Sequence, residues 1–67
     1  MPMHLDFPLI PITNNFSEHQ IKTAWQDIIC LIQSDHSIVP IKATIERIKE
    51  YTVVTLYSKN RAIKFAV

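Results

Sequence analysis

The side chains of this sequence that could act as nucleophiles, bases or metal ligands are few and scattered. The one cysteine is Cys30, and the three histidines, His4, His19 and His36, form no i, i+4 pair. On a helix, the separation of His19 and Cys30 corresponds to about 16 Å along the axis, too far for a base to reach the thiol. No carboxylate or cysteine recurs at a metal-ligand spacing. We therefore expect no catalytic residue, no metal ligand and no cofactor, and a protein that is not an enzyme.

The chain contains no glycine among its 67 residues. Phosphate-binding loops and nucleophile elbows need glycine, because their backbone turns tightly or approaches a phosphate closely. These sites are excluded. Turns must instead use asparagine, proline, lysine and serine, which type I geometry tolerates.

Charged side chains are distributed unevenly and indicate a binding surface. The first 37 residues carry one basic and four acidic side chains, whereas the remaining 30 carry six basic and two acidic ones. The predicted partner-binding residues are Tyr57, Lys59, Arg61, Lys64 and Arg47. Cations beside an aromatic ring suit the phosphates and bases of single-stranded nucleic acid. They suit an acidic protein surface equally well.

These residues must be positioned by a small number of elements, of which the first is a helix from about Ser17 to Gln33. Ser17 and Gln20 have the separation of a capping box. Apolar residues then recur with helical spacing on one face, at Ile21, Ala24, Trp25, Ile28, Leu31 and Ile32. Ile29 and Cys30 lie off that face. Either the amino-terminal arm or a neighbouring subunit covers them, or they belong to a partner-binding surface.

A β-hairpin is predicted at the carboxyl-terminal end, with strands 52–58 and 61–67 around a two-residue loop. Asn60 is expected to form the turn because asparagine tolerates positive φ. This loop places the large aliphatic side chains on one face of the hairpin. The expected pairs are Leu56 with Ile63, Val54 with Phe65 and Thr52 with Val67.

The stretch from Pro40 to Tyr51 decides the fold. Its isoleucines have helical spacing, but the alternation of Ile41, Ala43 and Ile45 and the β-branched content favour a strand. The predicted fold class is therefore α+β, one amphipathic helix packed on a small antiparallel sheet in the order β-α-β-β-β. The alternative is two helices followed by a C-terminal β-hairpin.

A single domain of residues 1–67 is expected, with residues 1–15 as an extended, proline-containing arm or edge strand. Pro8 and Pro11 lack a backbone donor, which excludes a central strand there. The longest apolar run, Ile28 to Ile32, is too short to span a membrane, and the start lacks the basic region of a signal peptide. We expect a cytoplasmic protein with no membrane partner.

A domain this small buries a limited core, so a larger partner or self-association is expected to supplement it. The last strand, at a sheet edge, offers free N–H and C=O groups to another strand. Lys64 discourages such pairing, whereas its apolar neighbours favour a homodimer through this C-terminal edge strand or strand addition to a target. The leading hypothesis is a small protein-binding module, an adaptor or inhibitor of a larger protein with an acidic surface. Nucleic-acid binding through the basic, tyrosine-containing face of the hairpin is the alternative.

Three short motifs carry a family resemblance. Ala24-Trp25-Gln26 opens the amphipathic stretch, and Leu56-Tyr57 and Asn60-Arg61 lie at a strand end. In these positions, over roughly residues 24 to 67, the chain resembles the amino-terminal protein-interaction domain of the bacterial replication initiator DnaA. That family continues with a further helix and strand after the Asn-Arg position, whereas Ile63-Lys64-Phe65 alternates like a strand. The resemblance implies an adaptor surface on the helix for replication partners, without catalysis.

Overall fold

The computed structural model describes residues 6–13 and 15–67, so the predicted arm of residues 1–15 lies partly outside the described residues. The elements, in chain order, are β1 (Leu9–Pro11), α1 (Glu18–Ser34), β2 (Pro40–Ile48), β3 (Tyr51–Ser58) and β4 (Ala62–Ala66). The predicted α+β class and the β-α-β-β-β order are confirmed. The two-helix alternative is wrong, because Pro40–Ile48 forms a strand.

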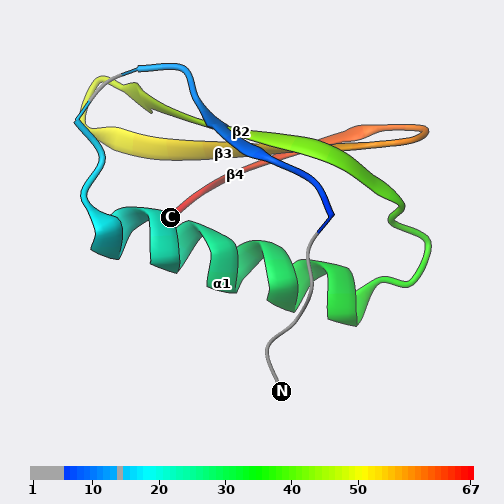
Figure 1. Ribbon diagram of the computed structural model, residues 1–67. Coiled ribbons are helices and arrows are strands. Elements are labelled where there is room, and N and C mark those ends of the chain that lie inside the picture. The colour runs from blue at the N-terminus through cyan, green and yellow to red at the C-terminus, as the bar shows by residue number, and fades with distance from the viewer. Residues whose placement is uncertain (1–5, 14) are drawn as a thin grey trace.

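The four strands form one mixed sheet in the order β1-β2-β3-β4, and α1 crosses one of its faces (Figure 1). β2, β3 and β4 are antiparallel neighbours, whereas β1 pairs with β2 in parallel. The parallel pair follows from the connection, since a helix between two adjacent strands returns the chain to the same end of the sheet. No described helix covers the other face, which we call the outer face (Figure 1).

Helix α1 begins as the sequence predicts. The Ser17 hydroxyl accepts a hydrogen bond from the backbone N–H of Gln20, and the Gln20 side chain accepts one from the backbone N–H of Ser17. This reciprocal capping box satisfies two of the donors that a helix start leaves free. The predicted apolar face is confirmed, because Ala24 and Ile28 are fully buried against the sheet.

The core lies between α1 and the inner face of the sheet. Its buried residues are Phe7, Ala24, Ile28, Ile38, Ala43, Ile45, Val54 and Leu56. Phe7, just before β1, packs its ring on Trp25 at 5.4 Å between centroids. The residue pattern explains why β2 and β3 pack against α1. Aliphatic residues occupy alternate positions of these strands, and their side chains point toward the helix.

Of the two hairpin turns, the β2–β3 turn contains a residue with positive φ, whereas the sequence predicts this conformation only in the β3–β4 turn, at Asn60. The β2–β3 turn at Lys49 and Glu50 has φ of 57° at Lys49, a conformation that glycine would adopt without cost. Asn60, which the sequence suggests for this conformation, does not adopt it in the β3–β4 turn. Instead, its side-chain oxygen accepts a hydrogen bond from the Ser58 hydroxyl at 3.3 Å. Within the described part of the chain, no helix has the length and apolar character needed to cross a membrane.

Candidate partner-binding edge and basic face

The outer edge of β4 carries backbone groups that pair with no described residue. Val67 N–H donates to the Thr52 carbonyl and Ser58 N–H to the Arg61 carbonyl, which fixes the phase of the β3–β4 ladder. In an antiparallel pair, residues that exchange hydrogen bonds alternate with residues whose N–H and C=O point the other way. The backbone groups that point outward therefore belong to Ala62, Lys64 and Ala66.

The opposite edge, β1, is less able to accept a strand. Ala43 N–H donates to the Pro8 carbonyl and Ile12 N–H to the Ile45 carbonyl, so residues 8, 10 and 12 face β2. Leu9 and Pro11 face outward, and proline has no N–H to donate. Proline and short length are known ways of protecting a sheet edge. The two edges of this sheet thus differ, and β4 is the one with an uninterrupted row of outward donors, at every second residue.

A groove lies beside β4 on the helix side of the sheet. It has a volume of about 350 Å³. Its lining residues are Asp27, Cys30, Leu31 and Ser34 of α1 and Ile63 and Phe65 of β4. Cys30 is exposed here, which agrees with its predicted place off the buried face of the helix. An apolar floor next to unpaired backbone donors is a combination that binds extended peptides.

On the outer face, the structure brings together Tyr57, Lys64 and a lysine that the sequence reasoning did not select. Lys42 pairs with Tyr57 across β2 and β3, and its Nζ lies 5.1 Å from the centroid of the tyrosine ring. Lys64 follows one row along, opposite Thr55. The side chains share a face because paired residues on adjacent strands point to the same side. The pairing of Lys42 with Tyr57 depends on the β2–β3 register, which the turn at Lys49 and Glu50 sets. Because that turn contains no glycine or asparagine, the sequence does not reveal the pairing.

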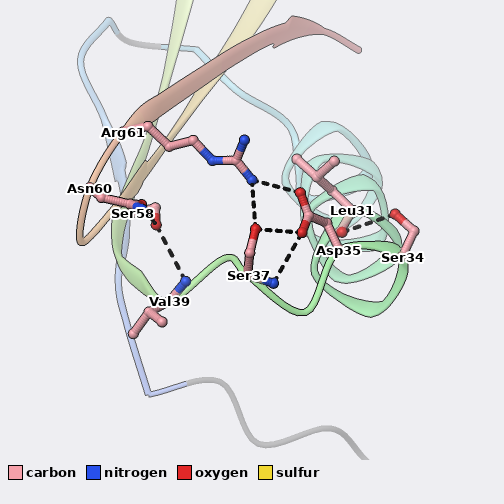
Figure 2. A network of polar contacts seen from close by, with 8 residues as sticks. All are labelled: Leu31, Ser34, Asp35, Ser37, Val39, Ser58, Asn60 and Arg61. Carbon is pink, nitrogen blue, oxygen red and sulfur yellow. Dashed lines mark hydrogen bonds and ion pairs between the residues drawn. The ribbon is translucent and has the colours of Figure 1, made fainter.

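Arg61, by contrast, points away from this face and toward the end of α1 (Figure 2). Its Nη2 lies 2.6 Å from Oδ2 of Asp35 and 3.1 Å from the Ser37 hydroxyl. Asp35 is the C-cap residue of α1, and its Oδ1 accepts hydrogen bonds from the hydroxyl and backbone N–H of Ser37 at 2.6 and 3.0 Å. Arg61 thus ties the β3–β4 hairpin to the α1–β2 connection.

This network changes the acidity of Asp35. The pKa of its carboxyl group falls from 3.8 to about 2, chiefly because the Ser37 hydroxyl donates to the charged form. The Ser37 backbone N–H contributes next, followed by the Arg61 guanidinium. Both side chains of the ion pair remain partly exposed, at 45% for Arg61 and 40% for Asp35. Because water screens the attraction between exposed charges, we attribute this contact mainly to its hydrogen bonds.

The two remaining predicted residues lie apart from each other. Lys59 is exposed in the β3–β4 turn, and its backbone N–H donates to the Val39 carbonyl at 2.9 Å. Arg47 pairs with Thr52 near the other end of the sheet, and its guanidinium lies 5.6 Å from the Phe16 ring centroid. The five predicted residues therefore do not form one surface. Tyr57 and Lys64 share the outer face with Lys42, whereas Arg61 and Arg47 are engaged elsewhere.

The same part of the chain, residues 6–13 and 15–67, holds no group of three histidine, cysteine, aspartate or glutamate side chains placed to bind a metal ion. No protein-family model, no curated protein and no solved structure matches this chain. The resemblance to the DnaA domain stays a prediction. The geometry of the β4 edge and its two flanking surfaces is thus the basis for a functional proposal.

Proposed function

We propose that this chain is a small, non-enzymatic protein-binding module, an adaptor or inhibitor, that docks on a larger protein through the β4 edge. The observation that carries the proposal is the inequality of the two sheet edges. Ala62, Lys64 and Ala66 direct their N–H groups outward, whereas the β1 edge is interrupted by Pro11. A free edge of this kind is a template for a strand of a partner.

Small side chains make the β4 edge accessible. Ala62 and Ala66 are exposed and carry only a methyl group, so their side chains cover little of the outward backbone groups. Lys64 is exposed between them. A lysine on an edge strand disfavours indiscriminate pairing, yet it also selects a partner with opposite charge.

Affinity capture from the native cell with two variants of one residue tests this proposal. Lys64→Pro removes the central outward N–H and places a ring at the edge, whereas Lys64→Ala removes the charge and keeps the donor. We expect the proline variant to capture at least about tenfold less partner protein than the alanine variant, because a strand of the partner cannot pair with the blocked edge. Equal capture by two variants with the circular dichroism spectrum of the wild type would contradict docking at this edge.

Nucleic-acid binding is the second candidate, favoured by Lys42, Tyr57 and Lys64 on one face. Two basic side chains and a ring could hold phosphates and a base. However, Lys42 lies over the Tyr57 ring, so a base must displace it to stack there. A random single-stranded oligonucleotide separates the candidates: binding at about 50 mM salt that weakens steeply as salt increases supports the second, and no binding at this salt excludes it.

A further inference from the structure

The position of Lys64 between Ile63 and Phe65 gives the β4 edge two different sides. Side chains alternate along a strand, and residues opposite each other on paired strands point to the same side. A strand added to β4 would therefore place its residues opposite Ile63 and Phe65 on the helix side. The residue between them would lie opposite Lys64, on the outer face.

The helix side of this edge is apolar. Ile63 and Phe65 are half-buried against the core, and they form one wall of the α1–β4 groove, with Leu31 and Cys30 on the other. Side chains of an added strand that point to this side enter the groove. Aliphatic side chains fit its lining, because burial of apolar surface is the favourable term available there.

Lys64 places a positive charge on the outer side of the edge. Lys64 is exposed and has no ion-pair partner among the described residues. On the same face, Lys42 and Glu46 of β2 each lie one row of the sheet away, on either side, so Lys64 is the charged group at the edge itself. Opposite charges that face each other across two strands are favourable, and like charges are unfavourable. The charge of this edge therefore matches an acidic side chain on the incoming strand.

The same lysine makes a second copy of the chain a poor occupant. An antiparallel pair of β4 strands that uses all outward donors, at Ala62, Lys64 and Ala66, is centred on Lys64. The two copies would then place their lysines directly opposite each other. This arrangement opposes a homodimer in the longest register, so a chain of different sequence suits the edge better.

We propose that the segment bound at β4 is an extended strand of another protein with an acidic side chain opposite Lys64 and apolar side chains opposite Ile63 and Phe65. This inference rests on the proposed function, and it adds the chemistry of the partner. The apolar side chains occupy the α1–β4 groove, and the carboxylate pairs with the lysine on the outer face. Recognition thus needs both sides of the edge.

Two synthetic peptides of about nine residues, with blocked ends, provide the probe. One has Val-Glu-Val at its centre and the other Val-Lys-Val, in the same threonine-rich flanks. Each is added in millimolar excess to the isotope-labelled full chain, and amide hydrogen exchange is followed residue by residue. The variant Lys64→Glu reverses the charge at the edge, and Lys59→Glu is a matched control in the adjacent turn.

We expect the glutamate peptide to slow exchange at Ala62, Lys64 and Ala66 and to bind roughly fivefold tighter than the lysine peptide. Lys64→Glu should invert this preference, whereas Lys59→Glu should retain it. Equal binding of both peptides at β4 would overturn the acidic partner and leave docking at the edge intact. If neither peptide slows exchange at these amides, docking at the edge itself fails. Protection in the peptide-free protein that increases with its concentration would identify a second copy as the occupant and overturn the proposal.

Discussion

The alternation of backbone donors along β4 predicts that proline is much more destabilising at position 65 than at position 64. At residue 64 the N–H points away from β3, so Lys64→Pro breaks no hydrogen bond of the sheet. At residue 65 the N–H faces the Val54 carbonyl. Phe65→Pro therefore removes a hydrogen bond between β3 and β4. Each proline variant is compared with the alanine variant at the same position, so that the effect of losing the side chain cancels.

The magnitude of the difference follows from burial. Val54 is fully buried, so its carbonyl has no access to water after the bond is lost. A buried polar group left without a partner costs about 1–3 kcal/mol. We therefore expect proline to be worse than alanine by about 2 kcal/mol or more at position 65, and by less than about 1 kcal/mol at position 64.

Urea denaturation measures this difference through the fluorescence of Trp25, the one tryptophan. A domain of this size has a free energy of unfolding of roughly 3–10 kcal/mol, so the difference is a large part of the total. A Phe65→Pro variant that fails to fold, beside a folded Lys64→Pro variant, gives the same answer. Equal proline effects at the two positions would refute the assignment of outward and inward donors on β4.

Three further predictions concern residues outside β4 that stabilise the fold. Ser17→Ala removes the N-cap of α1 and should lower the free energy of unfolding by about 1 kcal/mol, measured by urea denaturation. Lys49→Val places a β-branched residue at a φ of 57° and should lower the melting temperature, whereas Lys49→Gly should preserve or raise it. Because the Asp35 pKa is below its unfolded value, its contribution to stability is complete above pH 3.8 and is lost as the pH falls toward 2. Asp35→Asn should therefore lower the urea midpoint near neutral pH and reduce its decline in that acidic range.

Each of these has a distinct contrary result. A Ser17→Ala variant as stable as the wild type would mean that the capping box contributes little to α1. A Lys49→Val variant with an unchanged melting temperature would contradict the left-handed conformation at that turn. If the urea midpoint of Asp35→Asn declines from pH 3.8 to 2 as steeply as that of the wild type, Asp35 does not contribute to the loss of stability in acid.

Local sequence signals predicted the elements of the fold well. The Ser17–Gln20 capping box and the apolar spacing predicted α1, because both act within a few residues. The register Val54 with Phe65 and Leu56 with Ile63 also agrees with the structure, since the two-residue loop between the strands leaves few alternatives. The parallel pairing of β1 with β2 was not predicted, because it depends on where α1 returns the chain.

The arrangement of the candidate site depends on contacts between residues far apart in the sequence, which local sequence patterns do not predict. Arg61 was expected on the binding surface, but its contact with Asp35 joins residues 26 positions apart, through a helix end that the local pattern does not locate. Lys42 meets Tyr57 only because the β2–β3 turn falls at Lys49 and Glu50, a turn without glycine or asparagine. Charge and aromatic content indicated a basic face, whereas the residues that share that face are known only from the register of β2, β3 and β4.

Amide hydrogen exchange of β4, in the free protein and in complex with a captured partner, tests docking at this edge most directly. In the free protein, the amides of Ile63 and Phe65 should be protected, and those of Ala62, Lys64 and Ala66 should exchange rapidly. In the complex, all five should be protected, because the partner's strand accepts the outward hydrogen bonds. A stable complex in which the amides of Ala62, Lys64 and Ala66 still exchange rapidly would contradict strand addition at β4.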